Sequence, residues 1–237
     1  MKKTMKRLLS VAIVAMGCMA VSAQGSLTVD QLSRASRQQN RVQQGQSVSY
    51  YNSADVHPFG TFFVEYNPTT MHYSYKSMSD NTSYQGISVG ANYFTPFAGA
   101  LGADFGLKLQ YFFRNETENN YDYKDNMLSA TIPVDLAYDW HVSDGFAIYP
   151  YAGLYARFNI SASRKVEHGG SSTKHNPFSK DDMGDYTWDR FQFGWQAGVN
   201  FRISDMITIG GGYWMDLNEI DDHTKLYGFN ITLGANF

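Results

Sequence analysis

A strict alternation of residue types with a period of two is the feature that most constrains this sequence. In residues 191–203, FQFGWQAGVNFRI, seven apolar residues alternate with six glycine or polar residues. The last segment, LYGFNITLGANF over 226–237, places apolar side chains on one face and Gly, Asn and Thr on the other. Because successive side chains of a β-strand point to opposite faces, both segments predict long strands with two chemically different sides.

Six further segments share this period and bring the expected number of strands to eight. They lie within residues 62–66, 87–93, 105–113, 128–140, 148–160 and 207–215. Pro133 and Pro150 weaken two of these assignments, because proline cannot donate a hydrogen bond to a sheet. Eight is the smallest number of strands found in single-chain barrels of bacterial outer membranes.

The links between these segments alternate between long and short. Links one, three, five and seven are long, at 68–82, 115–126, 161–187 and 218–223, whereas the links at 95–100, 141–145 and 204–206 are short. Membrane barrels have short periplasmic turns and longer outer loops. We therefore predict an all-β fold: an eight-stranded antiparallel up-and-down transmembrane β-barrel with short periplasmic turns and longer extracellular loops.

The alternation does not by itself say which face points outward, since a lipocalin-type barrel has the same period with its faces reversed. Here the polar face holds many glycines, which would make a poor solvent surface but suit a narrow interior. The apolar face carries few charges over about ten residues, the spanning length of a tilted strand. We therefore expect the apolar face to point outward to lipid.

The first 58 residues differ from the rest of the chain. Lys2, Lys3, Lys6 and Arg7 precede an apolar run, and small residues end it before Gln24, so residues 1–23 are predicted to be a signal peptide. A membrane anchor and lipidation at Cys18 are the alternatives. Residues 24–58, rich in Gln and Arg, are expected to form a periplasmic extension or linker, or a short helix, before a barrel over 59–237.

Composition excludes several other classes. The 19 Lys and Arg residues nearly balance the 22 Asp and Glu residues, which gives no basic stripe for nucleic acid. The mean hydropathy of −0.38 excludes a bundle of membrane helices. If the export signal is removed after residue 23, the mature chain has no cysteine, and thiol chemistry is absent.

The signal peptide, the eight alternating strands and the terminal FNITLGANF resemble small bacterial outer-membrane β-barrels of the OmpA/OmpX/OmpW-like porin-family type. The resemblance covers roughly residues 59–237. It implies that the last strand is the signal for the barrel-assembly machinery, with Tyr227, Phe229 and Phe237 as its residues. It also implies contact with outer-membrane lipid and lipopolysaccharide. No peptidoglycan-binding domain follows the barrel, so we expect no cell-wall tether.

The inward face is expected to carry a network of charges. Its residues are Glu65, Asp104, Lys108, Asp135, Asp139, Arg157, Arg202 and Asp216. Opposite charges fall at matching heights along the strands, which indicates ion pairs that fill the interior, because an unpaired charge there would be costly to desolvate. A gate or a proton path is the functional alternative to packing.

No residue pattern identifies an enzyme, a metal or a cofactor. His168 and His175 lie near serines and acidic residues in 161–187, but no spacing singles out a nucleophile and its base. The acidic run 179–185 lacks the ligand order of a calcium loop, and 166–176 lacks a tetrahedral zinc set. We expect none of the three.

These observations favour a structural, envelope-stabilising or surface-interaction role, with a possible surface ligand bound through 161–187. The alternative is a narrow channel for small or hydrophobic solutes, as in OmpW-like barrels. A third class, a lipid-modifying outer-membrane enzyme, would need a His, a Ser and an acid to converge at the outer rim.

Overall fold

The computed structural model describes residues 56–118, 120–169, 171–179 and 188–237. One compact unit covers Ser53–Asn236; the other, Met1–Asn52 with Phe237, lies outside the described residues except for Phe237. The predicted signal peptide and most of the predicted linker therefore fall outside the described residues. Within the described ranges, no helix has the length and apolarity needed to cross a membrane.

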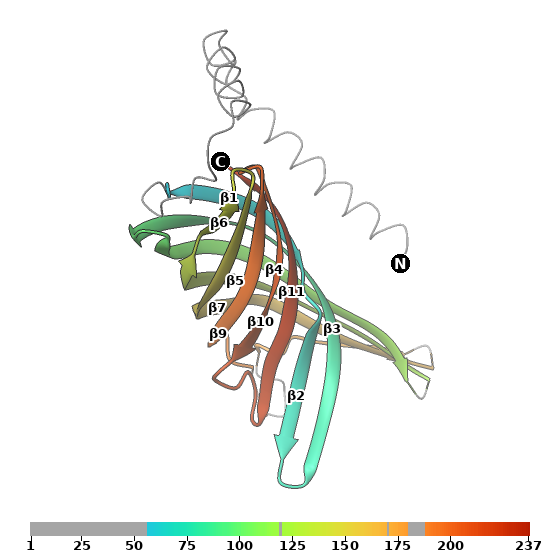
Figure 1. The fold of residues 1–237 in the computed structure, drawn as a ribbon. Coiled ribbons are helices and arrows are strands. Elements are labelled where there is room, and N and C mark those ends of the chain that lie inside the picture. The colour runs from blue at the N-terminus through green and yellow to red at the C-terminus, as the bar shows by residue number, and fades with distance from the viewer. Residues whose placement is uncertain (1–55, 119, 170, 180–187) are drawn as a thin grey trace, which may run out of the picture. The chain divides into compact units, whose positions relative to one another are not determined.

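Eleven strands form one antiparallel sheet (Figure 1). They are β1 Phe59–Tyr66, β2 Thr69–Tyr75, β3 Met78–Ala98, β4 Leu101–Glu118, β5 Tyr121–Tyr138, β6 Trp140–Ser143, β7 Phe146–His168, β8 Ser171–His175, β9 Phe191–Ile203, β10 Ile207–Asp216 and β11 Thr224–Asn236. The sheet closes on itself because β1 and β2 both pair with β3 on one side and β11 on the other. The eight-stranded barrel predicted from the sequence is confirmed.

Two of the eight positions in the ring are each occupied by two consecutive strands, β1 with β2 and β5 with the short β6. Between β1 and β2, Asn67 donates its amide to the Gly86 carbonyl at 2.8 Å, while Pro68 has no N–H and only accepts, from Phe229 at 3.0 Å. Between β5 and β6, the Asp139 amide donates to the Ala100 carbonyl at 2.8 Å. The backbone N–H groups of Asn67 and Asp139 and the carbonyl of Pro68 therefore keep hydrogen-bond partners where the strands are interrupted.

The two prolines lie inside strands of the barrel wall. Pro150 of β7 is opposite Val199 of β9. Pro133 of β5 is opposite Tyr155 of β7, but pairing on its other side stops between the pairs Phe105–Val134 and Lys108–Thr131. The interruption is expected beside a residue that cannot donate to the sheet.

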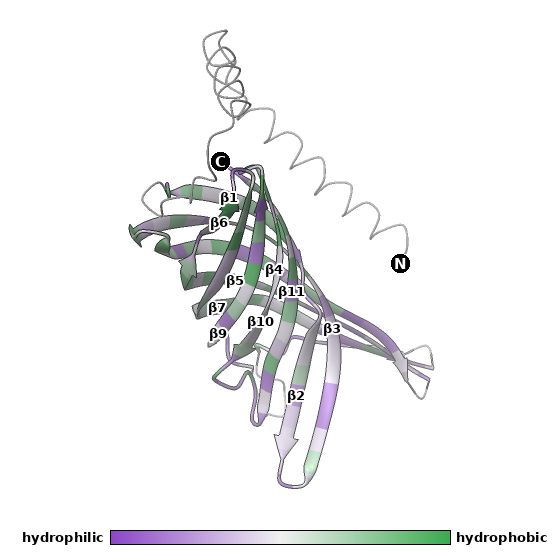
Figure 2. Ribbon diagram, in the orientation of Figure 1, coloured by the Kyte–Doolittle hydropathy of each residue, from purple (hydrophilic) through white to green (hydrophobic). Residues whose placement is uncertain are grey.

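The two faces of the barrel differ as the alternation predicts. Figure 2 shows residues of high and low hydropathy interspersed along the same strands. Large apolar side chains are exposed on the outer surface, among them Leu107, Ile132, Val134, Leu136, Leu154, Phe193, Phe229 and Ile231. Buried positions on the same strands hold charged and amide side chains. This is the reverse of a water-soluble barrel, and the outward direction of the apolar face is confirmed.

Three of the four long links contain strands that extend beyond the ring as hairpins. Residues 69–75 and 78–82 are strand and meet in a tight turn at Lys76, whose φ is 53°. Residues 115–118 and 121–126 continue β4 and β5, and the 161–187 segment contains the end of β7 and all of β8. These polar stretches pair with one another beyond the barrel, so they need no apolar face to form strands.

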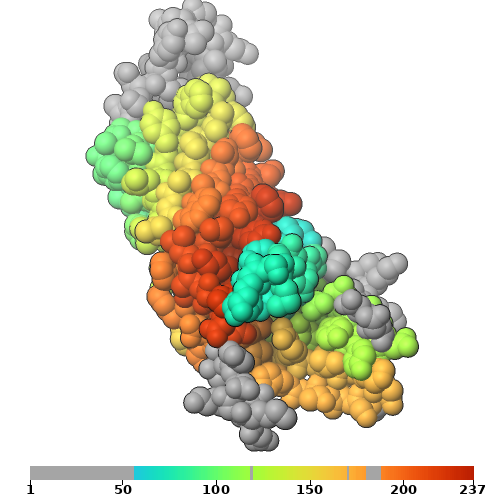
Figure 3. All heavy atoms as spheres, turned by 90° about the horizontal axis from the view of Figure 1, so that it is seen from below, coloured from blue at the N-terminus to red at the C-terminus, as the bar shows by residue number. Residues whose placement is uncertain are grey.

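The barrel therefore has two unlike ends. The short-turn end holds the turns at 99–100, 144–145 and 204–206, and the hairpin end holds the β2–β3, β4–β5 and β7–β8 hairpins. Above Gln85 and Phe113 the wall divides, because β3 pairs there only with β2 and β4 only with β5 among the described strands. The β2–β3 hairpin and the β4–β5–β7 strands diverge in Figure 1, and Figure 3 shows them as separate projections.

Candidate functional site in the barrel interior

The interior is lined by the polar face of the strands, and most of its side chains are buried. They include Thr61, Glu65, Ser88, Asp104, Lys108, Gln110, Ser129, Thr131, Asp135, Asp139, Arg157, Asn159, Gln192, Gln196, Arg202, Thr208, Asp216, Asn230 and Thr232. All eight charged residues that the sequence assigns to the inward face belong to this set. The neutral members were not singled out, although the same alternation places them inward.

Arg157 and Asp216 form the most deeply buried ion pair, with 1% and 0% of their side chains exposed. The Arg157 guanidinium donates to one oxygen of Asp216, and the Tyr155 hydroxyl donates to the other at 2.6 Å. The guanidinium carbon also lies 5.2 Å from the centre of the Trp214 ring. Strands β7 and β10, which are separated in the sheet by β9 alone, are thereby tied together inside the lumen.

Glu65 and Lys108 form a second buried pair in the middle of the barrel, with Nζ and Oε2 3.2 Å apart. The other oxygen of Glu65 accepts from the Asn230 amide at 3.1 Å and from the Thr232 hydroxyl at 3.3 Å. Three donors from β4 and β11 thus compensate one carboxylate. Heights along the strands placed Glu65 and Asp135 together with Lys108, without deciding between them, and gave no sign of the two neutral donors.

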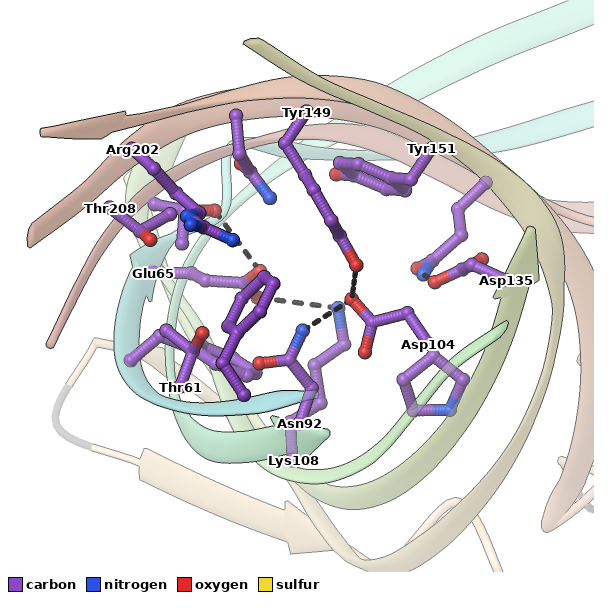
Figure 4. A pocket seen from close by; sticks show the side chains of 16 residues that line it. Thr61, Glu65, Asn92, Asp104, Lys108, Asp135, Tyr149, Tyr151, Arg202 and Thr208 are labelled. Carbon is purple, nitrogen blue, oxygen red and sulfur yellow. Dashed lines mark hydrogen bonds and ion pairs between the residues drawn. The ribbon is translucent and has the colours of Figure 1, made fainter. Parts of the chain in front are cut away.

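Asp104 and Asp135 lie opposite each other on β4 and β5 and receive neutral donors only. One oxygen of Asp104 accepts from the Asn92 amide at 2.6 Å and from the Tyr149 hydroxyl at 2.8 Å, as Figure 4 shows. One oxygen of Asp135 accepts from the Gln196 amide at 2.7 Å. Neither carboxylate is within ion-pair distance of a cation among the described residues.

Arg202 organises the short-turn end. Its guanidinium donates to Asp139 at 2.8 Å and to Asp205 at 2.7 Å, and it lies 4.0 Å from the centre of the Phe59 ring. His141 Nε2 is 3.0 Å from the same oxygen of Asp139. The ring of Phe59 in turn packs against Phe94 and Tyr149. Charged and aromatic side chains therefore fill this end of the lumen.

An apolar cluster fills the hairpin end. Its buried members are Met71, Tyr84, Phe112, Met127, Tyr155, Ala162, Trp214, Ile220 and Leu226. Phe178 and Trp188, which follow β8 in the chain, pack against it and are partly buried. The polar network is thus covered by apolar side chains on the side of the hairpins.

The space left between these layers is small. The cavity in the lower lumen measures about 50 Å³ and is lined by residues that include Glu65, Asp104, Lys108, Asp135 and Arg202 (Figure 4). Pockets that bind small molecules typically measure about 300–1,000 Å³. The cavity therefore has room for a few water-sized particles and none for an organic solute.

The β5–β7–β8 projection carries exposed charges beyond the barrel. Glu167 of β7 accepts a hydrogen bond from Lys124 of the neighbouring strand β5. Its Oε1 also lies 2.5 Å from Nζ of Lys165, which is on its own strand. Hydrogen bonds from Lys124 and Lys165 lower the pKa of Glu167 to about 2. The same contact raises the pKa of Lys124. The Lys124–Glu167 contact links β5 to β7 beyond the barrel.

Among the described residues considered for catalysis, His168 of β7 lies opposite Ser171 of β8, and its Nδ1 is 3.1 Å from the Asn120 carbonyl oxygen. His168 stacks on Tyr121 with ring centres 4.0 Å apart, and His175 lies opposite Arg164 on the neighbouring strand. Residues 180–187, which include most of the acidic run, lie outside the described residues. Within the described part of the chain, no group of three or more His, Cys, Asp or Glu side chains is arranged to hold a metal ion.

The terminal strand β11 closes the ring against β1 and β2. Phe229 is 58% exposed and its ring lies 5.2 Å from that of Tyr213, which also contacts Tyr227. Phe237 is 59% exposed. All three aromatic residues proposed from the family resemblance are thus on the outward or partly exposed side of the barrel, and their role in assembly stays a prediction.

Comparisons with known proteins identify a family model and several similar structures. A family model described as "Outer membrane protein beta-barrel domain" matches residues 19–222. Among solved structures, Ail, the attachment invasion locus protein of Yersinia pestis, is 14% identical, covering 77% of this chain and 100% of its own at a TM-score of 0.46. Neisserial surface protein A is 16% identical over 74% and 95%, at 0.40. OprG from Pseudomonas aeruginosa is 11% identical over 76% and 95%, at 0.41. No curated protein matches the chain.

Proposed function

The chain belongs to the outer membrane protein beta-barrel family, and from this premise we propose that it is a non-conducting barrel of the outer membrane with a structural or surface-interaction role. Its hairpin end then faces outward from the cell and its short-turn end faces the periplasm, as in other bacterial membrane barrels. The observation that carries this proposal is the extension of the strands into hairpins above a filled lumen.

The filled lumen supports a non-conducting role. Arg157 with Asp216, Glu65 with Lys108, and Arg202 with Asp139 bridge the walls at three levels. Removing one partner of such a pair leaves a buried, uncompensated charge, so the pairs do not open without a large cost. A narrow channel for small or hydrophobic solutes, the competing function, would need a continuous path past all three.

The projecting hairpins support an interaction with a partner at the cell surface. Among the described strands, β8 pairs only with β7, so one edge of Ser171–His175 has no partner strand there. Unpaired strand edges are sites at which an extended segment of another chain adds to a sheet. The polar composition of β8 limits indiscriminate pairing, and we propose this edge as the contact surface for the ligand first assigned to 161–187.

The test is a barrel with a shortened hairpin. Replacing residues 165–174 by Asn-Gly joins Arg164 to His175, which already face each other, through a two-residue turn. A matched control replaces residues 74–79 by Asn-Gly between Tyr73 and Asp80, which also face each other. Cells lacking the barrel would be complemented with each form, and detergent sensitivity and retention of proteins from the medium compared.

We expect the variant shortened at 165–174 to fold, shown by an unchanged difference in gel migration between unheated and boiled protein. It should lose surface retention while the control keeps it. Full retention by the folded variant would refute the role of the β7–β8 hairpin. A lipid-modifying activity, the third class, would instead be lost in a His175→Ala variant that retains the fold.

A further inference from the structure

Three lysines lie side by side across the sheet at the hairpin end. Lys124 of β5 is directly opposite Lys165 of β7, and Lys165 is directly opposite Lys174 of β8. Side chains of directly opposed residues in antiparallel strands share one face, with Cβ atoms about 4.5–5.5 Å apart, and like charges in such positions are destabilising. The pairing of these strands therefore gains nothing from the three residues, which we call the lysine row.

The acidic residue Glu167 compensates only part of this charge. It bonds both Lys124 and Lys165, so two ammonium groups share one carboxylate. Among the described residues, Lys174 forms no ion pair. The side chains of Lys124 and Lys165 are 48% and 38% exposed, and Lys174 is also exposed. Each ammonium has three donors, so the lysine row keeps both positive charge and free donors on the surface.

The lysine row continues the lipid-facing side of the barrel. Lys124 lies an even number of residues before Ile132 and Val134 on the same strand, and both of these side chains are exposed on the outer surface. Asp125 and Met127, which occupy the alternate positions of β5, are buried. Because successive side chains of a strand point to opposite faces, the lysine row points away from the lumen, in the direction in which the apolar side chains meet lipid.

Two aromatic residues of β4 show how far the apolar surface extends at this part of the wall. Tyr111 is opposite Leu128, and Phe113, whose ring stacks 6.1 Å from that of Tyr111, is opposite Asn126. Lys124 is two residues further toward the hairpin end than Asn126, which at about 3.4 Å per residue places the row roughly 7 Å beyond Phe113. Aromatic side chains form girdles at the two interfaces of a membrane barrel. The lysine row therefore lies at the level of the lipid headgroups.

We propose that the lysine row binds the phosphate of a lipid headgroup in the leaflet on the hairpin side of the membrane. A phosphate monoester carries more than one negative charge near neutral pH and offers three strong acceptor oxygens. Lysine binds phosphate as a point charge, and neighbouring strands, about 4.8 Å apart, bring the three ammonium groups close enough to share one phosphate. The lipid is the source of the phosphate because the row lies at headgroup level and faces the lipid side. The bound phosphate offsets the repulsion among the three lysines.

The inference is independent of the proposed surface role and is tested with purified protein. The full chain would be refolded in neutral detergent, and only heat-modifiable protein analysed. Native mass spectrometry would compare its binding of phosphatidic acid, whose headgroup is a phosphate monoester, with its binding of phosphatidylcholine. The test variant is Lys165→Gln with Lys174→Gln. The control is Lys76→Gln with Lys225→Gln, which removes the same charge from the β2–β3 turn and from β11, where Lys225 faces His72.

Three solvated contacts between opposite charges correspond to roughly a tenfold preference, which we expect for phosphatidic acid in the wild type and in the control. The test variant should lose most of this preference. Lys174→Gln alone, which breaks no ion pair among the described residues, should lower it by about half, so the test does not depend on the folding of the double variant. The absence of a preference in the wild type would overturn the inference. An equal loss in the control would also overturn it, because the effect would then belong to the overall charge. Displacement of the bound lipid by an equal concentration of inorganic phosphate would refute the lipid as the source.

Discussion

The Arg157–Asp216 pair offers the sharpest quantitative test of the filled lumen. In an Arg157→Met variant, the side chain keeps much of its volume but Asp216, which is fully buried, loses its cation and retains only the Tyr155 hydroxyl. Breaking a buried pair by removing one partner typically destabilises a protein by about 3–5 kcal/mol. We expect a loss of that size, reduced only if water enters from the hairpin end.

The free energy of unfolding would be measured in phospholipid vesicles by urea titration. Tryptophan fluorescence is a suited probe, because Trp214 lies 5.2 Å from the Arg157 guanidinium. The double variant Arg157→Met with Asp216→Asn should recover part of the loss, because no buried charge is left without its partner. Lys124→Met on the exposed hairpin serves as the control and should cost far less, since its pair with Glu167 is in contact with water.

A cost below about 1 kcal/mol for Arg157→Met would contradict the reasoning, because such values are typical of solvated ion pairs. Equal costs for the single and the double variant would also contradict it. Either result would mean that Asp216 is not left as a buried, uncompensated charge. The lumen near the hairpin end would then be accessible to water, contrary to the closed lumen proposed here.

Three further predictions address the outer face, the terminus and the hairpin. Val199→Arg should cost ~2–4 kcal/mol in the same unfolding assay if its side chain faces mid-bilayer lipid, with Val199→Leu near neutral; no cost for Arg would mean that the faces are reversed. Deleting Phe237 should slow insertion by the assembly machinery, measured as the yield of heat-modifiable protein in membranes. Undiminished insertion would show that Phe237 is not part of the assembly signal. The folded pKa of Glu167, about 2 against an ordinary 4.5, means that its contribution to the hairpin is complete above pH 4.5 and is lost as the pH falls toward 2. Protease cleavage within 165–175 should therefore rise over that range, except in Glu167→Gln, and a flat profile in the wild type would show that the pair does not order the hairpin.

Much of the fold is predictable because a membrane barrel imposes its chemistry on every second residue. Lipid requires apolar side chains such as Leu107 and Ile132 on the outside, and a narrow interior requires Gly and polar residues. The period of two therefore predicts both where the strands lie and which of their faces points outward. The hairpins at 69–82 and 115–126 were missed for the same reason. Apart from buried positions such as Met71, the side chains of these hairpins are largely exposed on both faces, and Thr, Tyr, Lys and Asp occur there without regard to face.

The charged members of the interior are predictable from the alternation, but their contacts are only partly so. Counting residues from the ends of strands matched Arg157 with Asp216 and placed Lys108 at the height of both Glu65 and Asp135. It could not separate Asp104 and Asp135, which lack a cation, from Asp139, which has Arg202, because tilted strands shift the heights across the lumen. Neutral donors such as Tyr149 carry no charge signal in a sequence that contains 17 tyrosines.

Single-channel conductance of the refolded barrel in a planar bilayer tests the closed lumen most directly. Heat-modifiable wild-type protein should give no discrete openings, because paired charges and the apolar cluster close the lumen and leave a cavity of about 50 Å³. Discrete openings in the wild type that change with Lys108→Ala or Arg157→Met would contradict the account and identify the charge network as the gate of a channel.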